Sequence, residues 1–337
     1  MTRLRGILGS ALLSVFSRLR PHRWLPPALS LRLLRPYFEA GSRDLALVMR
    51  AALTPDPAVL VRTDLSYDPT TGRDGLFDLV LPPTGGRPAP LIVWTHGGGW
   101  YYGSKADPLP YLELLARHGY AGASLNGPRT PEHRHPAGPR AAVRALTHLV
   151  EHAEEYGIDP TRIVLAGDSA GAQLAGSVAL ACVSPSYAAA LGVVAPMPPE
   201  HLRGTVLFSG TVDLPALLDA GRMFTAILAS SARAVSGTRH WTGSQAAELM
   251  TLRRHVTADF PPTFVRAGRA DPLTAGGSVP LVARLRELGI DLDAAILGDE
   301  ADGGEHNLQF RLGTRHADAI VTDLLLFLAR TTSSNSH

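Results

Sequence analysis

Hydrophobic and polar positions follow two alternating patterns along most of the chain. Short apolar or strictly alternating runs, which favour strands, are each followed by a longer run with apolar residues at helical spacing. Strands are expected at residues 76–81, 91–95, 121–125, 162–166, 205–209, 263–267 and 293–297. Helices are expected at residues 109–118, 139–156, 170–181, 278–288 and 316–328. Because strands and helices alternate, we predict an α/β fold with a mostly parallel sheet, right-handed crossovers and helices on both faces.

The alternation is interrupted between residues 213 and 257. This segment has a helix-and-loop pattern and contains an apolar patch, formed by Met223, Phe224, Ile227 and Leu228. We interpret the segment as a helical cap inserted into the sheet domain. Two interpretations of the patch stay open: an apolar lid over a site, or packing within the cap.

The N-terminal part differs from the rest. Apolar residues at helical spacing over 45–53 end before Pro55. We therefore predict an arm with cap helices over 1–70 and an α/β domain over 71–330. The polar residues 331–337 are expected to form a disordered tail.

The beginning of the arm is locally basic. The first 36 residues carry seven arginines and no acidic residue. Their apolar stretch, 7–16, is shorter than the roughly 20 residues that span a bilayer. Arg18 and Arg20 follow directly, without the small residues of a signal-peptide cleavage site, which disfavours secretion. Two interpretations stay open: a basic amphipathic helix that contacts a membrane surface or covers a site, or a helix simply packed on the domain.

The overall composition is that of a globular protein with a large apolar interior. The 337 residues are 45% hydrophobic and 18% charged, and the mean hydropathy is +0.06. A formal charge of +2 excludes the strongly basic field of a nucleic-acid-binding protein. The lone cysteine, Cys182, is expected to pack as a small hydrophobic residue. We expect a cytoplasmic location, with or without membrane association through the arm, and the oligomeric state stays open.

A candidate nucleophile lies between an expected strand and an expected helix. Ser169 stands in the sequence Gly-Asp-Ser-Ala-Gly, flanked by Gly167 and Gly171. A sharp turn of this kind projects a serine hydroxyl beyond the sheet, and the glycines let neighbouring backbone pass without a clashing Cβ. The following helix adds its positive dipole end beside the hydroxyl. This strand-turn-helix context disfavours a chance motif.

A second motif follows the strand at residues 91–95. His96 is followed by three successive glycines, at positions 97–99, and then by Trp100. Such a run is costly for ordinary packing, yet it suits a loop whose backbone N–H groups must approach a substrate oxygen. A merely flexible loop is the alternative, and the downstream Ser169 motif disfavours it.

With these motifs the chain resembles the hormone-sensitive-lipase-like family of α/β-hydrolases, which includes bacterial carboxylesterases and feruloyl-esterase-like members. Two further segments are similar to family motifs, namely Pro131-Glu132-His133 followed by Pro136-Ala137, and Asp271-Pro272-Leu273. The resemblance spans about residues 76–328 and implies the α/β-hydrolase fold.

The resemblance also implies roles for the glycine loop. The N–H groups of Gly98, Gly99 and Ala170 would form an oxyanion hole. His96 would support the loop instead of taking part in catalysis. Each such donor can contribute roughly 2.7–4 kcal/mol of transition-state stabilisation.

In this fold the acid and the histidine of a catalytic triad follow the serine in that order. Asp271 follows the strand at 263–267, and His306 lies after the last strand and before the final helix. We therefore expect both to act with Ser169. The competing acids after the last strand are interpreted as a solvated loop; they are Asp299, Glu300 and Asp302. His316, a later histidine, is expected at the start of the final helix.

The sequence departs from the family pattern in two places. The usual Asn-Tyr-Arg segment is replaced by Asn-Gly-Pro-Arg, which ends at Arg129. We expect Arg129 to pair with a nearby carboxylate such as Asp168 or Glu132, and Asp168 to be a structural support of the site. The histidine loop has Glu-His-Asn-Leu at 305–308 in place of the usual His-Gly-Phe, which affects the contour of the substrate side.

Aromatic residues follow the glycine loop. Trp100, Tyr101 and Tyr102 are expected to form walls of the substrate pocket, with core packing as the alternative. Together with the apolar cap, they favour hydrophobic esters.

These residues predict a serine carboxylic-ester hydrolase, an esterase or lipase that forms an acyl-serine on a small or hydrophobic ester. The expected partner is a small-molecule ester. No metal or organic cofactor is required, and no Cys/His cluster with metal-ligand spacing is present in the sequence. Two alternatives remain: an acyltransferase that uses the same acyl-serine, and a non-catalytic ligand-binding member of the fold, which the complete set of triad positions disfavours.

Overall fold

The computed structural model describes residues 27–83, 86–216, 222–298 and 304–333. Its centre is an eight-stranded sheet with the order β1-β2-β4-β3-β5-β6-β7-β8. The strands are β1 (Leu60–Ser66), β2 (Leu76–Leu81), β3 (Ala89–Thr95), β4 (Ala121–Leu125), β5 (Ile158–Asp168), β6 (Leu202–Phe208), β7 (Thr263–Gly268) and β8 (Leu292–Leu297). β2 runs antiparallel to both of its neighbours, and the other pairs are parallel. The prediction of a mostly parallel sheet is confirmed.

Helices lie between the strands, before the first strand and after the last one. They are α2 (Pro27–Ala52), α3 (Leu109–Ala116), α4 (Ala137–Glu151), α5 (Ala153–Tyr156), α6 (Ala170–Val183), α7 (Pro185–Leu191), α8 (Arg222–Ser236), α9 (Gln245–Met250), α10 (Val279–Glu287) and α11 (Arg315–Thr331). The helix expected over 139–156 is divided at His152, whose φ of −106° and ψ of 20° leave the helical region.

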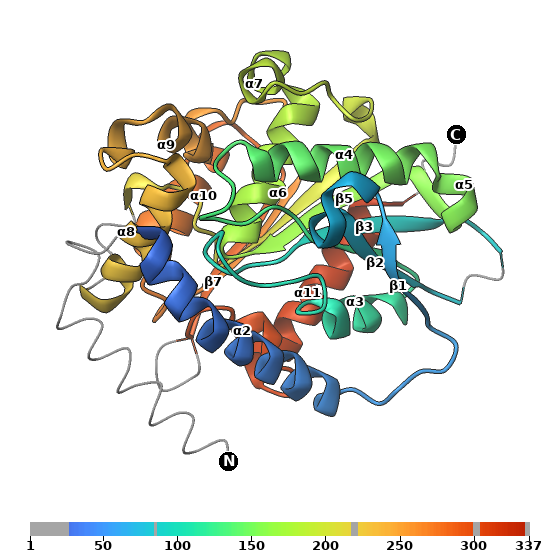
Figure 1. Cartoon of the computed structure of the whole chain (residues 1–337). Helices are drawn as coiled ribbons and strands as arrows, with labels where there is room; N and C mark the ends of the chain where they lie inside the picture. Colours follow the sequence, from blue (N-terminus) through green and yellow to red (C-terminus); the bar gives the residue numbers. More distant parts are fainter. Residues whose placement is uncertain (1–26, 84–85, 217–221, 299–303, 334–337) are drawn as a thin grey trace.

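Helices cover both faces of the sheet because successive strand residues point to opposite sides. Leu91 and Val93 of β3 pack in one core with α4, α6 and α10. Ile92 and Trp94 pack in a second core with α3, α11 and the end of α2. Figure 1 shows the two layers, with α4 and α6 on one side of the strands and α3 and α11 on the other.

The sheet begins earlier than the expected domain boundary at residue 71. β1 precedes that boundary and pairs with β2. Its pattern is weak in the sequence because polar residues dominate it and its register shifts between Arg62 and Leu65, beside Asp64 at a φ of 58°. A bulged edge strand of this kind lacks the strict alternation by which strands are recognised.

The N-terminal helix is also longer than expected. The apolar spacing over 45–53 marks only the last turns of α2, a helix of 26 residues that includes Pro36. α2 packs along α8 and then reaches α3, so it crosses the molecule from the cap to the sheet (Figure 1). Residues 1–26, with the first five arginines of the arm, and residues 334–337 of the tail lie outside the described ranges.

The segment between β6 and β7 is helical, and we call its described residues, 213–216 and 222–257, the cap. Its buried side chains form a separate cluster with Leu273 and Trp100, which includes Leu228, Trp241 and Met250. Of the expected apolar patch, only Leu228 has a described side chain, and it is buried. The side chains of Met223, Phe224 and Ile227 lie outside the described part of the structure. Among the described helices, none has the length and apolarity of a membrane span.

Candidate active site

Ser169 lies in the turn between β5 and α6. Its φ of 53° and ψ of −120° are strained for a residue with a side chain, and its N–H donates to the carbonyl of Phe208 at 2.8 Å. A Cβ on Gly167 would lie 2.4 Å from the carbonyl oxygen of Gly171, and one on Gly171 would lie 2.0 Å from that of Thr95. The glycines are therefore required by close backbone contacts, and the turn holds the serine at the carboxyl end of the sheet.

The glycine loop after β3 has backbone conformations that residues with a side chain rarely adopt. Gly98 has a φ of 118° and Gly99 a φ of 55°, and a Cβ on Gly98 would lie 2.2 Å from the carbonyl oxygen of Tyr102. Within the described residues, the N–H groups of Gly98, Gly99 and Ala170 donate to no protein acceptor. Backbone donors without a protein partner can hydrogen-bond an oxygen of a bound molecule.

His306 and Asp271 lie together, although they are far apart in the sequence. His306 Nδ1 is 2.8 Å from Asp271 Oδ2, and the other carboxylate oxygen accepts from the N–H of Leu273 at 2.9 Å. The Asp271 side chain is fully buried. Burial lowers the pKa of His306, but the hydrogen bond and charge of Asp271 outweigh this effect, and the charge of Asp168 adds to them, so the pKa is raised.

The structure pairs the hydroxyl of Ser169 with neither His306 nor Asp271. Within the described residues, Ser169 Oγ has no hydrogen-bond partner. Hydrogen bonds between a nucleophile and its base are often long until substrate binds. The two loops nevertheless meet at the end of β6, where Phe208 accepts from the Ser169 N–H and Ser209 Oγ accepts from the N–H of Asn307 at 3.1 Å.

Asp168, the residue before Ser169, is held by three donors. Its Oδ1 accepts from Trp94 Nε1 and from the N–H of Gly97, each at 3.1 Å, and its Oδ2 accepts from Asn307 Nδ2 at 3.0 Å. Burial raises the pKa of Asp168, while the hydrogen bond from Trp94 and the nearby imidazole of His96 act against that rise.

The expected partner of Arg129 is wrong. Arg129 Nη1 pairs with Glu39 Oε1 of α2 at 3.0 Å, and it approaches neither Asp168 nor Glu132. Glu132 is bound instead by Arg35 at 2.7 Å and by Arg32. Arg129 thus pairs with a nearby carboxylate, as expected, but with neither of the two that were named. α2 brings Glu39 over the loop, and the position of that helix could not be inferred from local pattern.

His96 supports the glycine loop from within. Its Nδ1 lies 2.6 Å from the carbonyl oxygen of Gly97, so this nitrogen carries a proton and donates. A Cβ on Gly103 would lie 2.5 Å from the same nitrogen, which shows how closely the ring fits between the two ends of the loop. In this arrangement the imidazole fixes the loop and its Nδ1 is not available as a base.

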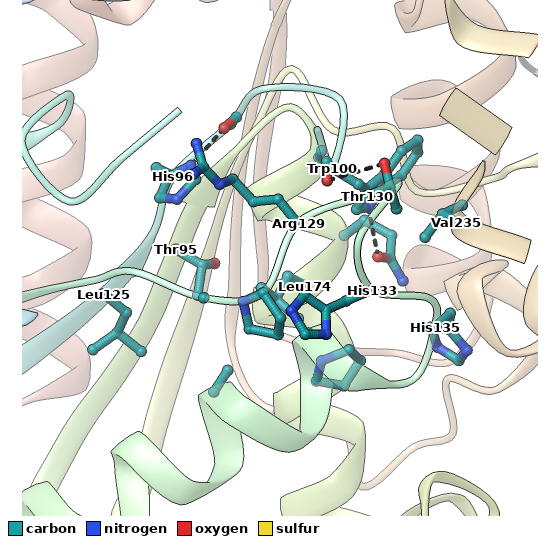
Figure 2. A pocket seen from close by; sticks show the side chains of 18 of the residues that line it. Thr95, His96, Trp100, Leu125, Arg129, Thr130, His133, His135, Leu174 and Val235 are labelled. Atoms are coloured by element: carbon teal, nitrogen blue, oxygen red, sulfur yellow. Dashed lines mark hydrogen bonds between the residues drawn. The ribbon is translucent and has the colours of Figure 1, made fainter. Parts of the chain in front are cut away.

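A cavity lies beside the serine turn, bounded by the glycine loop, the loop at 126–135, α4, α6 and the cap (Figure 2). It reaches Ala170, while Ser169, Asp271 and His306 are not among its lining residues. Its apolar walls are formed by Leu125, Pro128, Pro139, Leu174, Val235 and Met250.

Of the three aromatic residues expected to line the pocket, two do so and one does not. Trp100 and Tyr102 line the cavity, and Trp100 Nε1 donates to Gln173 Oε1 at 3.4 Å. Tyr101 differs from the expectation, because its side chain is buried with Leu31 of α2 and Ala234 of α8 and does not line the cavity. Neighbouring residues in this loop point in different directions, which sequence adjacency does not show.

Four residues around the site were not predicted from the sequence: Arg35, Glu39, Ser209 and Asn307. Asn307 could have been singled out from the sequence, because asparagine is one of the few residues with a side chain that tolerate a positive φ, and it directly follows the candidate catalytic histidine. The other three carried no such signal, since their contacts depend on the placement of α2 and the end of β6. In the described part of the chain, no group of three or more His, Cys, Asp or Glu side chains could hold a metal ion.

Comparisons with known proteins identify the family of this chain. The BD-FAE family model matches residues 77–282. The carboxylesterase NlhH of Mycobacterium tuberculosis is 38% identical over 116 residues, which cover 33% of this chain and 36% of NlhH. The esterase LipQ of the same organism is 27% identical over 67% of this chain and 53% of LipQ. The chain thus spans about a third to a half of the length of these curated relatives.

Solved structures share the fold over nearly the whole chain. Esterase B from Lactobacillus rhamnosis superposes with a TM-score of 0.78 at 19% identity, covering 90% of this chain and 96% of that one. A bacterial heroin esterase superposes with a TM-score of 0.70 at 23% identity, covering 89% and 92%. The sheet order, the serine turn and these matches agree, and the chain belongs to the BD-FAE family, among the hormone-sensitive-lipase-like α/β-hydrolases.

Proposed function

We propose that the protein is a serine carboxylic-ester hydrolase with Ser169 as nucleophile, His306 as general base and Asp271 as the acid that orients it. The observation that carries this proposal is the 2.8 Å contact between His306 and the buried Asp271, in a loop that meets the strained serine turn at the end of β6. Strained backbone persists where the surrounding structure demands it, and such positions gather at functional sites.

The proposed reaction proceeds in two halves. His306 takes the proton of the Ser169 hydroxyl while Oγ attacks the ester carbonyl, and the carbonyl oxygen becomes an anion. The C–O bond to the alcohol then breaks as His306 returns the proton to the leaving oxygen, which leaves an acyl-serine. Water repeats the sequence with the same base, so the acid is released and the enzyme is regenerated.

The oxyanion would be held by the N–H groups of Gly98, Gly99 and Ala170. These donors are fixed by backbone and have no acceptor to give up in the described structure, so little reorganisation is needed when the charge forms. Loss of one such donor costs about 2.7–4 kcal/mol of transition-state stabilisation in enzymes of this kind. Because the donors are backbone groups, substitutions would act by reshaping the loop.

The substrate class follows from the cavity and from the relatives. The apolar walls formed by Leu174, Val235 and Met250 suit a hydrocarbon part of a small ester, while Trp100 and Tyr102 lie at its boundary. NlhH is named a carboxylesterase, and a tributyrin phosphonate inhibits esterase B. We extend this ester chemistry to the present chain.

Acyl transfer is the alternative with the same acyl-serine, and it differs only in the acceptor. A non-catalytic receptor on this fold is a weaker alternative because the three expected triad positions are all filled. Product analysis with a competing alcohol separates transfer from hydrolysis: a new ester would indicate transfer, and free acid alone would indicate hydrolysis.

The test of the proposed function is a panel of p-nitrophenyl esters, from short to long acyl chains, with wild type, Ser169→Ala and the control Ser186→Ala. Ser186 is an exposed serine outside the site. Wild type and the control should turn over the esters, and Ser169→Ala should lose on the order of 10⁶ in kcat, the loss found when subtilisin is deprived of its nucleophile. A phosphonate should label Ser169 in wild type. Equal turnover by Ser169→Ala would exclude it as nucleophile.

A second proposal concerns peripheral membrane contact through the N-terminal part, and a cytoplasmic location stays a prediction from the sequence. The outer face of α2 carries Leu29, Leu33 and Leu47, which are 45%, 64% and 64% exposed and share one side of the helix at its 3.6-residue period. This apolar stripe follows the arginine-rich start of the chain, a combination typical of helices that lie on anionic lipid.

The membrane proposal is tested by sedimentation with vesicles of phosphatidylcholine, with and without phosphatidylglycerol. Wild type should bind the anionic vesicles, and the double variant Leu29→Ser/Leu33→Ser should bind less. The matched control is Leu326→Ser, which alters a leucine of another helix, α11, that is 67% exposed. Equal binding by all three proteins, or no binding by wild type, would contradict a lipid contact by this face.

A further inference from the structure

Asn307 occupies an unusual position directly after His306. Its φ of 57° and ψ of 40° are left-handed, a conformation that asparagine tolerates better than most residues with a side chain. Its backbone N–H donates to Ser209 Oγ at 3.1 Å, and its side-chain amide donates to Asp168 Oδ2 at 3.0 Å. A glycine could adopt the same backbone but could not make the second bond.

Asp168 connects this bond to the other parts of the site. The residue immediately precedes Ser169, and its second oxygen accepts from the N–H of Gly97 at the start of the glycine loop and from Trp94. The carboxylate is 5% exposed, so its bonds are sheltered from water. One buried side chain thus joins the serine turn, the glycine loop and the histidine loop.

We propose that Asn307 is a positioning residue for the reaction: its amide, bound to Asp168, fixes the distance between the His306 imidazole and the Ser169 hydroxyl. The inference rests on the proposed ester hydrolysis. Asp271 restrains only one nitrogen of the imidazole, and the loop around it could still shift along that bond. The bond from Asn307 to Asp168 adds a second restraint, directly from the nucleophile turn.

Geometry of this kind affects the rate more than the binding of substrate. A displacement of about 1 Å between reacting groups can cost on the order of 10²-fold in rate. Loss of the Asn307 bond should therefore lower kcat by about tenfold or more and change KM little, because the residue does not line the cavity. A residue with a purely structural role would lower the amount of folded enzyme and leave the kcat of the folded fraction unchanged.

The decisive experiment exchanges the two bonded side chains. N307D places a carboxylate against that of Asp168 and so removes the bond. D168N is the milder change, because a flipped Asn307 amide can accept from the new amide at 168. In D168N/N307D the new amide at 168 can donate to the new carboxylate at 307, while its oxygen still accepts from Trp94 and Gly97. We expect N307D to lose at least tenfold in kcat and D168N/N307D to regain at least tenfold over N307D.

Controls separate this outcome from general damage. Asn307→Gly keeps the turn and removes the amide, and it provides a folded test if a carboxylate variant unfolds. Glu305→Gln breaks the pair with Arg311 on the other side of His306 without touching Asp168, and its kcat should stay near that of wild type. Thermal unfolding and active-serine titration with a phosphonate report the folded, reactive fraction of every variant.

The outcomes are distinguishable. Additive losses in the double variant, or an Asn307→Gly enzyme with wild-type kcat, would overturn the positioning role while wild-type hydrolysis still supports the proposed function. If wild type hydrolyses no ester of the panel, both proposals fail. Recovery in the exchanged pair, with KM unchanged, would support the link.

Discussion

Arg35 Nε, on the N-terminal helix α2, donates to the carbonyl oxygen of Tyr101 at 2.7 Å, two residues beyond the last glycine of the glycine loop. The same guanidinium donates to the carbonyl of Thr130 at 2.6 Å and to Glu132 at 2.7 Å. The arm is therefore part of the site's framework, since one side chain joins α2 to the two loops that border the cavity.

We expect Arg35→Ala to destabilise the protein and slow the reaction. Hydrogen bonds to charged groups contribute about 1.5–3 kcal/mol each when buried, and partial exposure reduces this, so a loss of about 2 kcal/mol is expected. The matched control is Arg32→Ala: it removes a second partner of Glu132, but its side chain is 62% exposed against 19% for Arg35. Thermal unfolding should distinguish the two, and equal midpoints would contradict a special role for Arg35.

The pH dependence of ester hydrolysis should follow His306. Burial lowers its pKa, the bond and charge of Asp271 and the charge of Asp168 raise it, and the net direction is upward. The base must be neutral, so kcat/KM should increase with pH through an apparent pKa above the ordinary value of about 6.5. Protonation of His306 also stabilises the folded protein, because its pKa is higher in the folded chain than in the unfolded one. This stabilisation is complete below a pH of about 6.5 and is lost as the pH rises through the pKa of the folded state. A profile with its acid limb below 6.5 would contradict this direction.

Asp271→Asn should lower both kcat and the acid-limb pKa. An amide at this position removes the negative charge that stabilises the imidazolium and favours the wrong tautomer of His306, which costs about 10⁴-fold in kcat in a comparable triad. Stopped-time assays across pH check both quantities. Glu305, the acid directly before His306, serves as the control: Glu305→Gln should leave the pH profile of kcat/KM in place. A shifted profile in that variant would assign the acid's role to Glu305 instead.

Backbone strain at Ser169 should appear as a stability difference between two inactive variants. The serine has a φ of 53°, and strained positions of this type cost about 1–3 kcal/mol. Ser169→Gly relieves this strain and Ser169→Ala does not, so the glycine variant should be about 1 kcal/mol more stable after the higher entropy of its unfolded chain is included. Chemical denaturation of both proteins measures the difference, and the opposite order would show that the turn is not strained.

Two glycine-to-alanine substitutions should change the free energy of unfolding in opposite directions. In Gly171→Ala the new Cβ would lie 2.0 Å from the backbone oxygen of Thr95, so we expect a loss of about 3 kcal/mol or more together with lost activity. Gly41 lies inside α2, where an added Cβ would meet nothing within 4 Å, so Gly41→Ala should gain about 0.5–1 kcal/mol from helix propensity. Denaturation midpoints test the pair, and a tolerated Gly171→Ala would contradict the close approach of the two loops.

The parts of the fold that could be predicted share a local cause. A buried strand such as β3 and a helix such as α6 can be recognised from the spacing of apolar residues within a short stretch of sequence. The order of strands and helices along the chain then favours a parallel sheet. β1 was not predicted, because a bulge at Asp64 interrupts the alternation of apolar and polar residues by which a strand is recognised. The end of α2 was visible while its beginning was not, because its exposed leucines blur the division between apolar and polar faces.

The sequence by itself determined the α/β sheet, the serine turn and the chain order of the candidate triad, because these depend on neighbouring residues and on their order along the backbone. Only the tertiary structure decided that Arg129 pairs with Glu39, that Tyr101 is buried under α2, and that Asn307 bonds to Asp168. The last bond joins residues 139 positions apart. Contacts at such separations arise when whole elements pack against one another, and the packing of side chains between elements is not encoded in the local pattern of either one.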